Sequence, residues 1–276
     1  AGALAEYFGA IEGASLEANK GAYSYAWMII FAVIAAIMVL IGLYHIRMLP
    51  SNQIPSTTKK TTSEVGRELV AVIANFFTKK HIFYYICFII LYRLAEGFIM
   101  KIAPLFLRAS REVGGLGLSL KEIGTLNGVF GSAAFVLGSL LAGIYVSKFG
   151  LKRTLFTLCC IFNLPFLAYT FLAVTQPTNV YLIGTCITME YFGYGFGFVG
   201  LTLFMMQQIA PGKHQMSHYA FASGIMNLGV MLPGMVSGYF SDLLGYRNFF
   251  IYVLIATIPA FLITYFIPFT YDDSKK

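Results

Sequence analysis

Charged residues are scarce in this sequence. Asp, Glu, Lys and Arg make up 11% of the 276 residues, whereas an ordinary soluble domain carries about 25%. Hydrophobic residues make up 58%. This balance excludes an ordinary soluble protein and indicates an integral membrane protein, in which each charge inside an apolar run needs a specific reason.

The sequence also lacks the patterns of metal, covalent or nucleic-acid chemistry. Its four cysteines are Cys87, Cys159, Cys160 and Cys186, all in apolar runs and without metal-ligand spacing. The four histidines form no HExxH motif. No basic patch with interleaved aromatic residues is present, and the net charge of +7 is explained by membrane topology. We therefore expect no enzyme, no metal, no cofactor and no nucleic-acid partner.

The chain begins without a methionine or a cleavable signal. AGALAEYFG contains no basic residue ahead of an apolar segment. We interpret residues 1–22 as the end of a preceding segment followed by an outer loop. The sequence is therefore expected to be a fragment.

Seven apolar runs predict an all-α integral membrane protein. A helix needs about 20 residues to cross the hydrocarbon core of a bilayer. Runs of this kind are predicted as spans at 23–43, 82–107, 120–146, 155–174, 180–206, 219–240 and 249–269. In lipid, a helix satisfies every backbone N–H and C=O within its own segment. A buried helix in a soluble core is the alternative for any one run, but it does not account for seven in succession.

The basic residues predict the orientation of the spans. Cytoplasmic loops of membrane proteins carry an excess of Lys and Arg. If the connection at 45–80 is cytoplasmic, most of the 19 basic residues lie on that side of the membrane. This predicts a cytoplasmic C-terminus, with 271–276 as a short inner tail.

The connection at 45–80 has two parts. Its first half is rich in Pro, Ser, Thr and Lys, which predicts a flexible linker. In its second half, Thr61 and Glu64 have the spacing of a capping box. Apolar residues then recur at helical period, at Val65, Leu69, Val72, Ile73 and Phe76. We predict an amphipathic helix on the inner membrane surface, with packing on a soluble partner as the alternative.

The order of helices and one loop motif resemble the major facilitator transporters. One helix at 23–44, a basic linker and six helices at 81–270 fit the end of one six-helix half followed by a second half. The loop GIYVSKFGLKRTL is similar to the family signature G-x-x-x-D-R-x-G-R-K/R-R/K-x-L. Its matching positions include Gly143, Lys148, Gly150, Lys152 and Arg153. Ser147 replaces the usual acid and Leu151 a basic residue, while the glycine turn and the basic cluster are kept.

Within that superfamily, the chain resembles the AmpG-type muropeptide permeases. ILYRLAEGFIMK is similar to their seventh helix, MEYFGYGFGFVGLTLFM to the tenth and SHYAFASGIMNLG to the start of the eleventh. The resemblance implies a major facilitator fold, here the C-terminal six-helix half plus one preceding transmembrane helix. It also implies proton-driven import of an anhydro-muropeptide, a cell-wall degradation product, across a bacterial inner membrane during peptidoglycan recycling.

Three charges interrupt the second predicted span. A charge at the centre of a span costs about 2.5–3.5 kcal/mol on insertion scales, so such residues usually face a bundle interior or a cavity. At about 100° per residue, Tyr85, Tyr92 and Glu96 fall on one line, which we expect to face the cavity. Arg93 lies at the edge of that line and can pair with Glu96. Lys101 points away, and we expect its stem to reach the outer interface.

Glu190 is the other acid far from the ends of a predicted span. Counted along the helices, Glu190 and Glu96 lie at similar depth. Two acids in one cavity suit proton exchange, because burial favours the protonated form of a carboxyl group. The predicted proton-coupling residues are Glu190 and Glu96. The predicted substrate-binding residues are Tyr85, Tyr92, Arg93, Glu96, Tyr194, Asn127 and Asn227.

Alternatives remain for these residues and for the function. The Arg93 and Glu96 pair also fits a packing salt bridge, the tyrosines fit core aromatics, and each asparagine could bond a neighbouring helix. We favour a secondary active transporter. Its expected partners are a muropeptide-like substrate, protons, membrane lipid and a missing N-terminal half of the same protein. A facilitator for a glycoside, peptide or acyl-coenzyme A is the alternative, and a membrane protein without transport activity is a more distant one.

Overall fold

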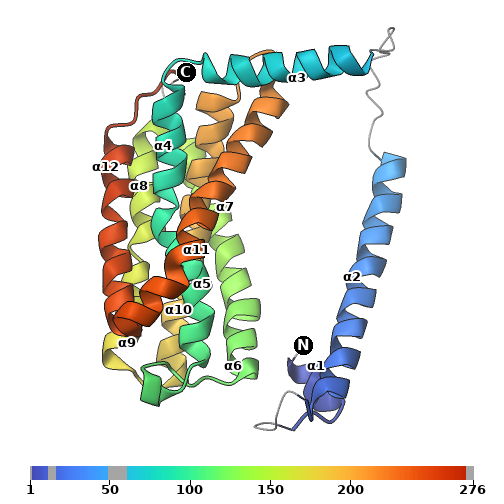
Figure 1. Ribbon diagram of the computed structural model, residues 1–276, viewed down its shortest axis with the longest axis vertical. Coiled ribbons are helices and arrows are strands. Elements are labelled where there is room, and N and C mark those ends of the chain that lie inside the picture. The colour runs from blue at the N-terminus through green and yellow to red at the C-terminus, as the bar shows by residue number, and fades with distance from the viewer. Residues whose placement is uncertain (1, 12–16, 49–60, 272–276) are drawn as a thin grey trace. The chain divides into compact units, whose positions relative to one another are not determined.

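The computed structural model describes residues 2–11, 17–48 and 61–271, and these residues form helices and connecting turns (Figure 1). The chain divides into two compact units, Ala1–Thr62 and Ser63–Lys276. The flexible linker and the C-terminal tail predicted from the sequence fall largely outside the described residues. The second unit holds every residue of the predicted site.

The first unit consists of two helices, α1 (Gly2–Tyr7) and α2 (Lys20–Met48). The Asn19 side chain, just before α2, accepts from the Ile11 backbone N–H at 2.9 Å and donates to the Ile11 carbonyl oxygen at 2.8 Å. α2 is about 44 Å long at helical rise, and Ala26 is its one buried residue among those described. An apolar helix exposed on all sides is suited to lipid or to a protein partner.

The second unit is a bundle of helices with one helix across its end. That helix is α3 (Thr62–Phe77). The bundle consists of α4 (Ile82–Tyr92), α5 (Leu94–Arg108), η1 (Arg111–Val113), α6 (Leu120–Thr125), the π-helical η2 (Leu126–Gly131), α7 (Ser132–Phe149), α8 (Leu151–Asn163), α9 (Phe166–Thr175), α10 (Val180–Phe204), the π-helical η3 (Met205–Ile209), α11 (Gln215–Ala256) and α12 (Ile258–Tyr265).

Five helical stretches within the described residues are long and apolar enough to cross a bilayer. They are Lys20–Met48, Ile82–Arg108, Leu120–Phe149, Leu151–Thr175 and Gln215–Tyr265. The last has 51 residues, about twice the length of one crossing. α10 has sufficient length, but glycines, tyrosines and Glu190 make it less apolar. The all-α membrane fold class is confirmed, whereas seven crossings remain a prediction.

Several predicted spans are interrupted in the structure. The run at 82–107 is broken at Arg93, whose φ of −103° and ψ of 6° separate α4 from α5. The run at 155–174 is broken before Pro165, which has no N–H to donate. α11 turns at Gly245, whose φ of 70° is in the left-handed region that favours glycine. A predicted span therefore does not always correspond to one straight helix.

Glycines hold α10 tightly between two neighbours. A Cβ atom on Gly195 would overlap the Phe135 carbonyl oxygen of α7, and one on Gly197 would overlap the Phe162 side chain of α8. Small residues allow this close approach of helix backbones in membrane proteins. The packing therefore fixes the position of Glu190, which α10 carries.

α3 is attached to the bundle by its C-terminal end (Figure 1). Phe76 is fully buried, and its ring contacts those of His218 and Phe221 on α11. Beyond the helix, Lys79 Nζ donates to the carbonyl oxygens of Ile209 and Pro211, the latter at 2.8 Å. Burial lowers the pKa of Lys79 below its ordinary value. The predicted helix is thus present, and its position on the membrane surface remains a prediction.

We expect Lys79→Met to loosen α3, because methionine keeps part of the apolar stem and removes both hydrogen bonds to the bundle. Bonds from charged donors contribute about 1.5–3 kcal/mol each. Hydrogen exchange of the amides of α3 should become at least several-fold faster. Lys80→Met is the matched control, since Lys80 is exposed. Equal exchange in the two variants would contradict the attachment.

We expect Gly138→Ala to destabilise the bundle. The added Cβ atom would overlap the Phe192 carbonyl oxygen, and overpacking of this kind typically costs about 1–3 kcal/mol. Gly143→Ala, on the same helix, meets nothing within 4 Å and should be neutral or slightly stabilising. Thermal unfolding in detergent measures both. Similar unfolding midpoints for the two variants would show that α7 and α10 are not in such close contact.

Candidate functional site

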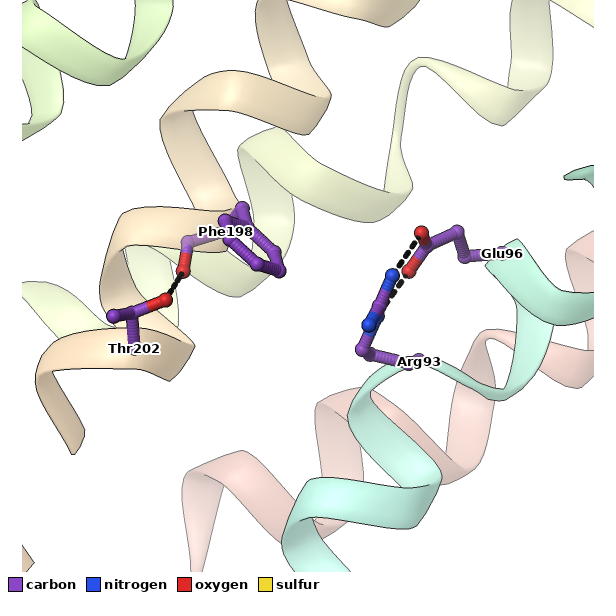
Figure 2. A network of polar contacts seen from close by, with 4 residues as sticks. All are labelled: Arg93, Glu96, Phe198 and Thr202. Carbon is purple, nitrogen blue, oxygen red and sulfur yellow. Dashed lines mark hydrogen bonds and ion pairs between the residues drawn. The ribbon is translucent and has the colours of Figure 1, made fainter. Parts of the chain in front are cut away.

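A buried ion pair lies at the break between α4 and α5. Arg93 Nε donates to Glu96 Oε2 at 2.6 Å, and Nη2 donates to Oε1 at 2.5 Å (Figure 2). The two residues are 5% and 6% exposed. Glu96 lies in the first turn of α5, where the helix dipole favours a carboxylate. Two-point contact fixes the plane of the guanidinium group.

Phe198 of α10 lies against the same guanidinium group. Arg93 Cζ is 5.4 Å from the centre of the Phe198 ring (Figure 2), a distance at which a cation and an aromatic face attract each other. Thr202 Oγ1 donates to the Phe198 carbonyl oxygen at 3.0 Å. Phe198 was not among the residues predicted from the sequence. Its four-residue spacing from Tyr194 was the signal that could have placed the two on one helix face.

A pocket of about 140 Å³ brings together side chains from four elements. It is lined by Glu96, Ile99, Met100, Ala103, Pro104 and Leu107 of α5, Asn127 of η2, Tyr169 of α9, and Glu190, Tyr191 and Tyr194 of α10. Four residues predicted from the sequence are therefore neighbours in space, namely Glu96, Asn127, Glu190 and Tyr194. Tyr169 was missed, because nothing in the sequence relates α9 to α5.

The two acids of this pocket have different surroundings. Glu96 is neutralised by Arg93, whereas Glu190 has no hydrogen bond or ion pair among the residues that the structure describes. Asn127 also has a buried Oδ1 atom without a hydrogen-bond partner. No cluster of three or more His, Cys, Asp or Glu that could hold a metal is found within the described ranges. The carboxyl group of Glu190 is thus available to a proton or a ligand, and Asn127 Oδ1 is available to a ligand.

The expected cavity-facing line is wrong for Tyr85 and Tyr92. Both are buried, at 1% and 0% exposure, and neither lines the pocket. Tyr92 Oη donates to the Gly197 carbonyl oxygen at 2.9 Å, and Tyr85 Oη is 2.8 Å from Thr270 Oγ1. The prediction assumed one uninterrupted helix, but the break at Arg93 ends it. These hydroxyl groups join helices to one another inside the bundle.

Asn227 and Lys101 also lie outside the pocket. Asn227 is exposed on α11 and does not line the pocket, so the geometry lends no support to its predicted contact with substrate. Lys101 is exposed, and its stem lies against α11 near Gly234. That Lys101 is not a ligand of the site remains a prediction.

The loop motif forms a one-residue connection between α7 and α8. Gly150 has a φ of 78°, and its N–H donates to the Val146 carbonyl oxygen at 2.8 Å. Gly143, Lys148, Gly150 and Arg153 line a second, open pocket of about 600 Å³. Lys152 does not line it. The glycine turn is thus present, and the role of the motif in conformational change remains a prediction.

Comparison with known proteins finds relatives over most of the chain. A sequence model of the Major Facilitator Superfamily matches residues 1–210. An anhydromuropeptide permease of Escherichia coli (strain K12) is 23% identical over 209 residues, which are 76% of this chain and 41% of that protein. A protein of Rickettsia bellii (strain RML369-C) named "Putative transporter AmpG 1" is 25% identical over 238 residues, 85% of this chain and 56% of that protein.

The chain thus spans about half the length of the curated relatives it matches. Their names describe a permease and a transporter, and the helical, membrane-suited bundle described above is consistent with both. The family model covers well over half of the chain, including the helix break at Arg93, the motif loop and the pocket with Glu190. On this basis, the chain belongs to the Major Facilitator Superfamily.

Proposed function

We propose that this chain forms the C-terminal half of a secondary active transporter in a bacterial inner membrane. Together with a preceding six-helix half, it imports anhydro-muropeptides or related cell-wall products, driven by protons. The observation that carries the proposal is the pocket in which one acid is paired with Arg93 while the other, Glu190, is not. The names of the relatives support the substrate class.

The two acids suit different roles in such a cycle. An acid that is already paired with arginine holds its charge, and the pair can open to let the guanidinium group bind a carboxylate of the ligand. An acid without a cationic partner in an apolar bundle favours its protonated form, so it can take up a proton under conditions in which a paired acid stays ionised. We assign proton coupling to Glu190 and ligand binding to the Arg93 and Glu96 pair.

The proposed orientation places α3 and the C-terminus in the cytoplasm, as the basic residues predict. α3 then lies at the inner membrane surface, where lipid covers the exposed apolar side chains of Val65, Leu69 and Ile73. The motif loop with Lys148 and Arg153 faces the same side. The preceding half supplies the opposite wall of the transport path.

We expect Glu190→Gln to abolish proton-driven accumulation while sparing ligand binding. Glutamine keeps the shape of the side chain but cannot exchange a proton. Uptake of a labelled muropeptide into vesicles should rise under an inwardly directed proton gradient for the wild type and stay flat for the variant. Glu112→Gln, at an exposed acid of η1, is the matched control. Gradient-driven accumulation by Glu190→Gln would assign proton coupling elsewhere.

Variants of the ion pair separate ligand binding from packing. Arg93→Gln or Glu96→Gln alone leaves one buried charge unpaired, which costs about 3–5 kcal/mol. The double variant removes both charges and should recover most of the lost thermal stability. We expect its affinity for a muropeptide to stay at least tenfold below that of the wild type.

Lys101→Gln is the control, because it removes a charge that lies outside the pocket. The affinity of this variant for the muropeptide should equal that of the wild type. Thermal unfolding and equilibrium binding in detergent give the two readouts. If the double variant recovers binding together with stability, the pair serves packing only, and the assigned ligand role is wrong.

A further inference from the structure

The part of the pocket that this chain encloses beside Glu190 is small. Its volume is about 140 Å³, whereas sites that enclose drug-sized ligands measure about 300–1,000 Å³. It therefore has room for one substituent of a larger ligand. The chemistry of its lining determines which substituent fits.

Asn127 supplies the pocket with an unsatisfied amide. Its Oδ1 atom is buried and has no hydrogen-bond partner, and a buried acceptor that is left unpaired is unfavourable. The residue lies in the π-helical segment η2, and short π-helical segments are rare and often occur at functional sites. An N–H group from a ligand would satisfy this atom.

The wall formed by α5 favours an apolar end group. Ile99, Ala103 and Leu107 of α5 present aliphatic side chains to the pocket. Tyr191 brings a phenol group, which can donate to a carbonyl oxygen. A methyl group gains from burial against this aliphatic wall.

We propose that this pocket binds an acylamino group of the substrate, an N–H and carbonyl followed by a small alkyl group, and that Asn127 determines this specificity. This inference rests on the proposed function and concerns the same site. The ligand N–H donates to Asn127 Oδ1, and the alkyl end lies against α5. An acetylated amino sugar and a peptide bond both carry this chemistry.

Binding to the purified full-length transporter, measured by calorimetry in detergent, tests the proposal. The probes are a muropeptide with acetylated amino sugars, the same compound after removal of the acetyl groups, and the peptide part alone. We expect the acetylated compound to bind at least tenfold more tightly than the deacetylated one. In Asn127→Ala, the ratio of the affinity for the acetylated compound to that for the deacetylated one should fall to near one. Affinity for the deacetylated compound should be retained, which shows that the variant is folded.

Asn75→Ala, at an exposed asparagine of α3, is the matched control and should keep the full ratio. If the peptide alone binds and its affinity falls in Asn127→Ala, the acylamino group is that of a peptide bond. Equal affinity for the acetylated and deacetylated compounds, or an unchanged ratio in Asn127→Ala, would overturn the inference. Absence of binding by all three probes to the wild type would instead refute the proposed function.

Discussion

The cost of charge in an apolar surrounding governs the centre of this bundle. Arg93 and Glu96 are almost fully buried, and each would be strongly unfavourable there without the other. They lie three residues apart, with Arg93 at the helix break and Glu96 in the first turn of α5, so one chain segment supplies both partners. Phe198 covers the guanidinium group and joins the pair to α10. The start of α5, and with it one wall of the pocket, depends on this arrangement.

α10 combines two kinds of surface on one helix. Its glycines allow α7 and α8 to approach at the distance of backbone contact. Glu190, Tyr191 and Tyr194 form a different surface, which lines the pocket. Close packing on the glycine side restricts motion of the helix, so the acid is presented from a rigid support. Such support is what a group needs if it must select one ligand or transfer one proton.

The sequence predicted the helices well because lipid imposes a strong rule on composition. Each predicted span is helical in the structure, and the turn at Gly245 falls within the predicted connection between the last two spans. The tyrosine prediction was wrong for Tyr85 and Tyr92, since an ideal helix was extended through Arg93. The last predicted span also continued to 269, although α12 ends at Tyr265. Local breaks depend on contacts with other helices, which periodicity does not contain.

Composition, the order of apolar runs and the position of four intramembrane charges were sufficient to identify the membrane class, the family resemblance and Arg93, Glu96 and Glu190 as candidates. They were sufficient because every charge in an apolar span is costly and must be compensated nearby. The shared pocket of Glu96, Asn127, Tyr169 and Glu190 followed only from tertiary packing. These residues are separated by long stretches of sequence, and their proximity depends on which helix faces are in contact. Side-chain volumes and close approach at glycines together determine those contacts.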